Sequence, residues 1–336
     1  MKLRQQRNAP MLYAVGSRLL ALLSVLFGVS LISFAMIHLS PGDKAQAIAK
    51  ARYPESQTFP TDILNAIRVE FHLNDPFLVQ YFHWLKNFLQ GDFGRSFSSG
   101  ATVWEIFVGN IGETAILTVS ALLFGLVLAF LLATVSVWRP GSFIDRFAVA
   151  LASIGAAMPS YWLGLLLIMF FAAHLNWLPA YGTGSLSHLI LPTLTLGLWV
   201  TASQTRLLRA FFLEAKSAPF VETLRLRGVS ETEIFWRHIL RHSAIPALNM
   251  IALDVASLLE GAVIVEIIFA RGGVGSLLAG SVLSRDYPVI LFLVVFFALT
   301  YVAINSLVEL LQDLLDPRKG WSSSITCTSV NTEQTS

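Results

Sequence analysis

Three carboxylates stand in one apolar run of the chain, at Asp254, Glu260 and Glu266. Holding a charged side chain in mid-membrane costs about 2.5–3.5 kcal/mol on insertion scales, so such residues usually mark a function. Asp254 lies near the centre of the run, and residues spaced by six cannot all share one narrow helix face. We expect Asp254 and Glu260 to line a translocation pathway that favours a cationic substrate or metal chelate. The alternative for Asp254 is a buried partner for a polar group on a second subunit.

A polar region from Ala210 to Leu248 is the longest polar interruption in the second half of the chain. Pro219 prevents a helix from continuing out of the preceding apolar run, and Gly228 stands where a short helix would turn. Apolar side chains fall on one face on either side of this glycine: Phe220, Val221 and Leu224, then Ile234, Phe235 and Ile239. Two short amphipathic helices rich in Lys and Arg suit an element that docks against another protein. An ordinary basic cytoplasmic loop is the alternative.

The seven histidines are scattered along the chain. His238 and His242 have an i, i+4 spacing that can bind a metal on one helix face, but no cysteine or third ligand accompanies them. The single cysteine, Cys327, excludes a disulfide framework and a Cys-based metal site. Neither a G-x-S-x-G elbow nor an H-E-x-x-H motif is present. We therefore expect no catalytic residue and no metal site in this chain.

The composition is that of an integral membrane protein. Of the 336 residues, 55% are hydrophobic and 13% are charged, and the mean hydropathy is +0.65. A soluble domain carries about 25% charged residues. This composition indicates that the chain is surrounded by lipid. The net charge of +2 gives no indication of nucleic-acid binding, and no nucleic-acid partner is expected.

Six apolar runs reach the roughly 20 residues that cross a bilayer. They are Leu19–Leu39, Thr114–Val137, Phe147–Ala173, His188–Leu208, Ala244–Ile268 and Pro288–Leu311. The first run is too long for a signal-peptide core, and no A-x-A-like cleavage site follows it. Pro192, Gly197 and Gln204 interrupt the fourth run, yet membrane helices tolerate such residues. The sequence predicts an all-α integral membrane protein with six transmembrane helices.

The distribution of Lys and Arg sets the orientation of these spans. With the N-terminus inside, the inner segments hold roughly twice as many Lys and Arg as the outer ones, as the positive-inside rule requires. Most of the outer positive charges lie in one long loop, and long loops are translocated largely regardless of charge. Both termini and the loop at 210–243 are therefore expected on the cytoplasmic side.

These assignments divide the chain into four parts. Residues 1–39 form a cytoplasmic N-terminus and the first span, and residues 40–112 form an outer segment too long for a plain connector. Helical periodicity at Thr61–Phe71 and Phe77–Leu89 predicts that this segment folds as a small helical cap. Residues 113–316 form a five-helix core that includes the 210–243 loop. Residues 317–336 are a Ser/Thr-rich cytoplasmic tail that we expect to be disordered.

Short motifs follow one another in a fixed order along the chain. They are Ser40-Pro41-Gly42-Asp43, Asp75-Pro76, Gln80-Tyr81, Gly91-Asp92-Phe93-Gly94-Arg95-Ser96, Met158-Pro159, Trp177-Leu178-Pro179, Ile190-Leu191-Pro192, Arg285-Asp286-Tyr287-Pro288 and Asp316-Pro317-Arg318. In their order and spacing they resemble the B-type permease subunit of the dipeptide/oligopeptide/nickel family of ATP-binding-cassette (ABC) importers. The resemblance runs from about Leu12 to Arg318.

The 210–248 region is similar to the ATPase-coupling signature of this family, E-A-A followed by Gly and later by Leu/Ile-Pro. Here it is Glu222-Thr223-Leu224, then Gly228, then Ile245-Pro246. Thr223 and Leu224 replace small residues of the family pattern, which is expected to loosen or reshape the ATPase contact. Gly272 replaces a common Pro in the patch at 266–275. Glu266 matches a family position, which favours a structural role near the outer mouth.

The resemblance implies roles for several loop residues. Glu222 would be the polar contact to an ATPase, with Thr223 and Pro246 in the same signature, and Gly228 the turn between the two helices. Arg225, Arg227 and Arg237 would either contact the ATPase or hold the loop inside. An apolar face of the loop helices docked in an ATPase groove would fit the helix-in-groove mode.

The resemblance also implies an assembly and a location. This chain would have the type I ABC importer permease fold and would act in a bacterial inner membrane. It would work with a homologous second permease, two cytoplasmic ATPases and an extracytoplasmic solute-binding protein. The chain contains no G-x-x-x-x-G-K-[ST] phosphate loop, so ATP and Mg would be bound by the partner ATPases and no cofactor by this chain.

Three other functions fit the sequence less well. An ion-coupled secondary carrier could use the intramembrane acids, but no inverted repeat is visible and the coupling-type loop would have no role. An intramembrane hydrolase lacks a nucleophile motif, and a simple membrane anchor would need neither a cap nor six spans. Among substrates, the sequence leaves short peptides, nickel, and nickel- or zinc-chelating small molecules open.

Overall fold

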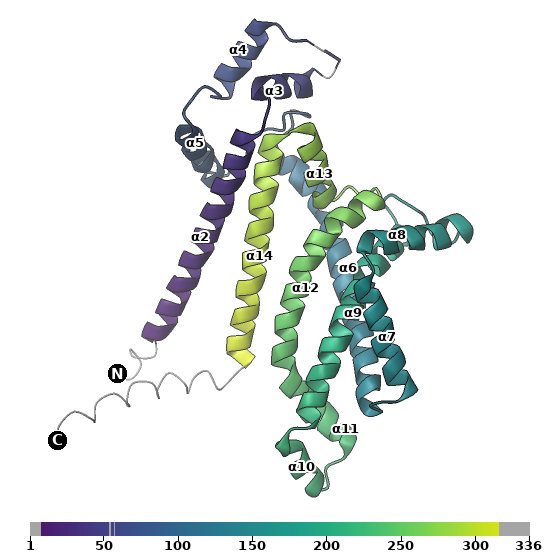
Figure 1. Ribbon diagram of the computed structural model, residues 1–336. Coiled ribbons are helices and arrows are strands. Elements are labelled where there is room, and N and C mark those ends of the chain that lie inside the picture. Colours follow the sequence, from purple (N-terminus) through teal and green to yellow (C-terminus); the bar gives the residue numbers. More distant parts are fainter. Residues whose placement is uncertain (1–7, 54, 57, 316–336) are drawn as a thin grey trace, which may run out of the picture. The chain divides into compact units, whose positions relative to one another are not determined.

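The computed structural model describes residues 8–53, 55–56 and 58–315, and these residues are helical with short connections (Figure 1). The elements are α2 (Asn8–Leu39), α3 (Lys44–Arg52), α4 (Thr61–Glu70), α5 (Phe77–Leu89), α6 (Val103–Trp138), α7 (Phe143–Ala157), α8 (Ser160–Leu167), the π-helix η1 (Ile168–His174), α9 (Ser187–Lys216), α10 (Pro219–Leu226), α11 (Glu231–Glu233), the π-helix η2 (Ile234–Ile239), α12 (Leu240–Ile268), α13 (Val274–Ser284) and α14 (Tyr287–Leu315). An isolated antiparallel β-bridge within the described residues joins Arg95 to Thr102. The predicted all-α class is confirmed. The expected tail at 317–336 lies outside the described residues.

Among the described helices, three are long and apolar enough to cross a membrane: Leu22–Leu39 within α2, Val103–Trp138, and Tyr287–Val308 within α14. Helices α9 and α12 are 30 and 29 residues long but are not among these three. Both contain polar residues and an internal proline, Pro192 in α9 and Pro246 in α12. The count of six spans remains a prediction.

The third predicted span was wrong as a single helix. Helix α7 ends at Ala157, and α8 begins at Ser160 with Pro159 as its N-cap residue. A proline lacks the backbone N–H and disfavours helical geometry in the residue before it, so Met158-Pro159 ends the helix. Helices α7, α8 and η1 together count at most as one broken span.

The described chain divides into two compact units, and several helices contribute to both. The first unit comprises the described residues up to Leu122 together with Pro159–Leu196 and Leu258–Val302. The second comprises Leu123–Met158, Gly197–Ser257 and the described residues from Ala303. Each unit has its own packed core.

The predicted cap helices are present in the first unit as α4 and α5. Helix α3 was not predicted, because its alanine-rich sequence carries only a weak apolar period. Ala45, Ile48 and Ala49 of α3 pack against Leu64 and Ile67 of α4. The two helices are also joined at the start of α3, where the Asp43 carboxylate accepts from Ala45 N at 2.9 Å and from Arg68 Nη2 at 2.7 Å.

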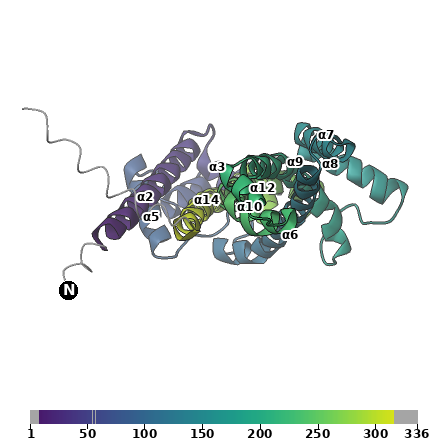
Figure 2. The same ribbon diagram turned by 90° about the horizontal axis from the view of Figure 1, so that it is seen from below.

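Packing in the second unit explains how the loop between α9 and α12 is held. Its buried core joins α6, α9, α10, η2 and α12 through Ala129, Ala133, Val137, Leu208, Phe212, Ala215, Val221, Ile234, Phe235, Ile239 and Ala247. Helix α7 is attached to α9 by an ion pair in which Arg209 Nε and Nη2 donate to Asp145 at 2.6 and 2.7 Å. Helices α9, α10 and α12 are seen together end-on in Figure 2.

Candidate functional site: the loop at 217–239 and the buried carboxylates

The loop between α9 and α12 begins later than predicted and is shorter, although its first helix starts at Pro219 as the proline indicated. Helix α9 continues to Lys216, beyond the expected limit at 210, and α10 then starts with Pro219 at its first turn. The ring of Pro219 fixes a helical φ and needs no hydrogen-bond partner for nitrogen at this position. A new helix therefore starts three residues after the old one ends.

Gly228 ends α10 in the left-handed conformation, with φ of +77°. Its N–H donates to Arg225 O at 2.9 Å, and Val229 N–H donates to Leu224 O at 3.1 Å. These two bonds satisfy carbonyls that the end of a helix leaves free. A Cβ at Gly228 would meet nothing within 4 Å, so the backbone conformation, and not space, favours glycine here.

The second helix of the loop is not separate from the fifth predicted span. Ser230 caps α11 by accepting from Glu233 N at 3.3 Å, and α11 then passes through η2 into α12 without a break. Pro246, expected as the end of the coupling signature, lies inside α12. The loop and α12 thus form one continuous helical path in the backbone.

The apolar face of the loop helices does not face outward, so the expected apolar contact with an ATPase groove was wrong. Val221 and Ile234 are fully buried, and Phe235 and Ile239 are nearly so, all in the core of the second unit. Leu224 is partly buried against the same core. The amphipathic pattern was correctly recognised, but its apolar side serves internal packing, as on most surface helices.

The opposite face of the loop is exposed, and its chemistry is mixed. Glu222, Thr223 and Arg227 are exposed, and Leu226 is 81% exposed at the end of α10. Trp236 is 51% exposed on η2. Thr223 therefore departs from the family pattern on the exposed side, whereas Leu224 departs from it on the packed side.

Arg225 and Glu231 link the two halves of the loop across Gly228. Arg225 Nε donates to Glu231 Oε1 at 2.6 Å and its Nη2 to Oε2 at 3.3 Å, while Nη1 reaches Glu222 Oε2 at 3.5 Å. The hydrogen bonds from the guanidinium lower the pKa of the Glu231 carboxyl below its ordinary value. Arg225 thus holds the loop together, a role that sequence spacing alone did not indicate.

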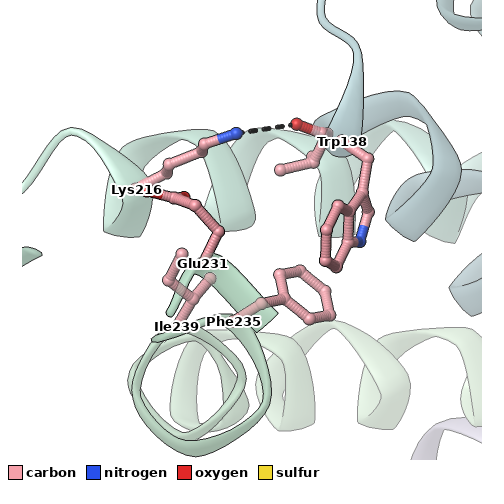
Figure 3. A pocket seen from close by; sticks show the side chains of 6 residues that line it. Trp138, Lys216, Glu231, Phe235 and Ile239 are labelled. Carbon is pink, nitrogen blue, oxygen red and sulfur yellow. Dashed lines mark hydrogen bonds between the residues drawn. The ribbon is translucent and has the colours of Figure 1, made fainter. Parts of the chain in front are cut away.

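Lys216 ties the loop to the end of α6 (Figure 3). Its Nζ donates to Val137 O at 3.1 Å, where the last carbonyls of a helix lack intrahelical partners and favour a cation. Lys216, Glu231, Phe235 and Ile239 line a cavity of about 20 Å³ with Val137 and Trp138. This volume is large enough for about one water molecule.

The intramembrane acids differ in their surroundings. Asp254 is 5% exposed and accepts from Gln204 Nε2 of α9 at 2.6 Å, so its partner belongs to the same chain. Glu260 is exposed. Their proposed place on the pathway remains a prediction.

Glu266 is fully buried and organises the patch that follows α12. It accepts from Thr114 Oγ1 at 2.5 Å and from Ser276 N at 2.9 Å. A Cβ at Gly273 would come within 2.2 Å of the Glu266 carboxyl, so this glycine is required by close packing. Arg271 of the same patch pairs with Glu113. The structural environment agrees with the structural role expected for Glu266.

The outer motifs, separate in sequence, meet in the first unit. Asp286 accepts from Ser96 Oγ at 2.5 Å, Phe97 N at 3.0 Å, and Ser98 N and Oγ at 3.3 and 2.8 Å. Arg285 Nη1 donates to Pro41 O at 3.3 Å. Sequence reasoning identified these motifs only as family markers and missed that they bind one another. The residue types could have indicated this contact, because one motif offers a carboxylate as an acceptor and the other offers serine hydroxyls as donors.

Within the described residues, no group of three or more His, Cys, Asp or Glu side chains could hold a metal ion. His238 and His242 lie on η2 and α12, and the His242 ring packs against Phe220.

Comparison with known proteins identifies the family. Residues 99–321 match the family described as the inner membrane component of binding-protein-dependent transport systems, and residues 11–118 match the N-terminal family of such membrane components. The glutathione transport system permease protein GsiC of Escherichia coli (strain K12) is 36% identical over 308 residues, 91% of this chain and 98% of GsiC. GsiC of Shigella dysenteriae serotype 1 (strain Sd197) matches over the same shares.

Two solved structures support the fold. An inward-facing form of the MetNI methionine ABC transporter has a TM-score of 0.53 at 16% identity, covering 63% of this chain and 96% of that chain. An amino acid ABC transporter solved with histidines has a TM-score of 0.51 at 14% identity, covering 62% and 94%. The chain therefore belongs to the family of binding-protein-dependent transport inner membrane components and is the permease subunit of an ATP-driven ABC importer.

Proposed function

We propose that this permease carries short peptides of the glutathione class, delivered by an extracytoplasmic solute-binding protein. The similarity to GsiC along nearly its whole length supports this substrate class. The complete importer would contain this chain, a homologous second permease and two cytoplasmic ATPases. Both termini of the chain would lie in the cytoplasm.

The exposed face of the 217–239 loop is the proposed contact with an ATPase. The observation that carries this assignment is the division of the loop into two faces. Val221, Ile234 and Ile239 anchor it in the core of its own unit, while Glu222 and Leu226 remain exposed. A load placed on the exposed face would reach α9 and α12 through this anchored core.

A pair of variants at Leu226 tests the contact. Leu226→Asp places a charge on the proposed contact, and Leu226→Met keeps an apolar side chain of similar volume as its control. Purified complexes would be compared for retained ATPase subunits and for ATP hydrolysis stimulated by binding protein. We expect Leu226→Asp to lower stimulated hydrolysis by about tenfold or more, because a few central residues dominate interface energies. Unchanged association and hydrolysis in Leu226→Asp would reject the contact.

The substrate proposal has a direct test with a clear rival. Proteoliposomes holding the complete importer would be given labelled glutathione or labelled Ni²⁺ with the solute-binding protein and internal ATP. ATP-dependent uptake of glutathione supports short peptides as the substrate. Uptake of Ni²⁺ without uptake of glutathione supports nickel as the substrate. Glutathione uptake driven by an ion gradient in the absence of ATPase subunits would favour the ion-coupled carrier.

Asp254 and Glu260 remain our candidates for the translocation pathway. Glu260 is the more accessible of the two in this chain, and Asp254 has a polar partner on α9. During transport, the Asp254 carboxylate would release the Gln204 amide and bind a cationic group of the substrate in its place.

A further inference from the structure

Helix α5 has two apolar faces, and the described residues of the chain cover only one of them. Phe77, Tyr81, Trp84 and Phe88 form ring contacts with residues of α2, Phe93 and Phe292. A second apolar face carries Leu78, Phe82 and Leu89, which are 59%, 56% and 77% exposed. At 3.6 residues per turn these three positions fall within about 40° of one another around the helix. The three exposed side chains therefore lie next to one another and form a stripe along the helix.

Three polar side chains of α5 point in another direction, whereas a fourth, Lys86, is exposed next to the stripe. Gln80, His83 and Asn87 line a cavity of 410 Å³ that is also lined by Lys44 of α3 and Tyr287 of α14. Gln80 further donates to Leu73 O and Asp75 O at 3.1 and 2.7 Å. The side of the helix that carries Gln80, His83 and Asn87 is therefore used within the first unit, and the exposed stripe faces away from it. The long side chain of Lys86 would extend its charged end toward the membrane surface while its apolar stem lies along the stripe.

The position of α5 along the first span sets its depth. The Tyr81 hydroxyl lies 2.9 Å from Ser30 Oγ, and both residues are almost fully buried. Ser30 lies about 13 Å below Leu39 along α2, at the helical rise of about 1.5 Å per residue. The apolar window of α2 is Leu22–Leu39, and half a bilayer's hydrocarbon core is about 15 Å thick. Tyr81 therefore meets α2 at the depth of the bilayer interior. Figure 1 shows α5 beside the upper part of α2.

We propose that α5 enters the outer leaflet of the membrane beside the first span and that its Leu78–Phe82–Leu89 stripe contacts lipid acyl chains. Helix α2, against which α5 packs, also carries exposed apolar residues, which include Phe27, Ile32 and Met36. A helix with separate polar and apolar faces is suited to this position, because its backbone groups are satisfied internally. The outer segment then consists of an aqueous part, α3 and α4, and a membrane-embedded part, α5.

Spin labels in the complete importer, reconstituted in lipid nanodiscs, test this placement. In a Cys327→Ser background, Phe82→Cys and Leu78→Cys would carry the label on the stripe. Met36→Cys on α2 is the control for a membrane span, and Val69→Cys on α4 is the matched aqueous control, because Val69 is also an exposed apolar residue, at 71%. The measurement is relaxation of the label by oxygen, which is enriched in lipid, and by chromium oxalate, which is confined to water.

We expect labels at positions 78 and 82 to be reached by oxygen and protected from chromium oxalate, as at Met36→Cys. Their ratio of oxygen to chromium accessibility should exceed that of Val69→Cys by about tenfold or more, since a charged complex is strongly excluded from hydrocarbon. Ready access by chromium oxalate would place the stripe in water and overturn the proposal. Protection from both reagents would show a protein partner on the stripe and would overturn it as well.

Discussion

Asp286 and Asp254 are both nearly buried carboxylates, 2% and 5% exposed, but they are held in different ways. Asp286 accepts two backbone N–H groups and two serine hydroxyls from residues 96–98. Asp254 is bonded by the Gln204 side chain, whose Nε2 donates to it at 2.6 Å. Backbone donors cannot move away without rearranging the chain, whereas a glutamine side chain can rotate. The difference indicates a fixed joint at Asp286 and an exchangeable contact at Asp254.

Removing the carboxylate at the fixed joint is expected to give the largest effect. Asp286→Ala leaves the hydroxyls and amides of the 96–98 turn without a partner in a buried site. Hydrogen bonds to a charged group each contribute about 1.5–3 kcal/mol, so we expect a loss of at least about 3 kcal/mol in the free energy of unfolding. Thermal unfolding of the purified complex measures it. Asp286→Asn, which keeps an acceptor oxygen, is the matched variant and should lose less. Equal stability of Asp286→Ala and the natural chain would remove the distinction between the two carboxylates.

At Asp254 we expect a smaller change in stability and a larger change in transport. Asp254→Asn keeps an acceptor for Gln204 Nε2 and should change the unfolding free energy by about 1 kcal/mol or less. Uptake should fall, because the proposed role needs a negatively charged Asp254 that releases Gln204 and binds the substrate. Asp254→Leu, which leaves Gln204 buried and unpaired, should lose about 1–3 kcal/mol. Normal uptake by a stably assembled Asp254→Asn importer would sink the pathway role.

The elements of this fold were predictable where one physical signal dominated. The apolar period located α4 and α5, and Pro219 and Gly228 marked the start and end of α10. The break of the third span at Met158-Pro159 was missed, because the apolar length of the run favoured a single helix over the local effect of the proline. What could not be predicted depends on contacts between residues distant in sequence. The bond from Ser96 to Asp286 crosses 190 positions, and no local pattern distinguishes an apolar face that packs internally from one that meets a partner.

The smallest effect is expected in the loop at 217–239, where the charges are exposed. Glu231→Gln removes the charge that pairs with Arg225 across Gly228, and exposed ion pairs contribute little to stability. The pKa of Glu231 is lowered in the folded chain by Arg225, so the pair stabilises the loop above the ordinary carboxyl pKa of about 4.3. That contribution is lost as the pH falls through the lower, folded-state pKa. Unfolding of Glu231→Gln should therefore approach that of the natural chain as the pH falls through the lowered folded-state pKa of Glu231. Glu233→Gln, on the exposed Arg237 pair of the same loop, is the control for a general charge effect.

The same two variants test whether the Arg225–Glu231 link matters for coupling. If both variants change coupled ATP hydrolysis alike, the Arg225–Glu231 link has no specific role in holding the loop. If Glu231→Gln alone weakens coupling, the loop needs its two halves held together even where little folding energy is involved.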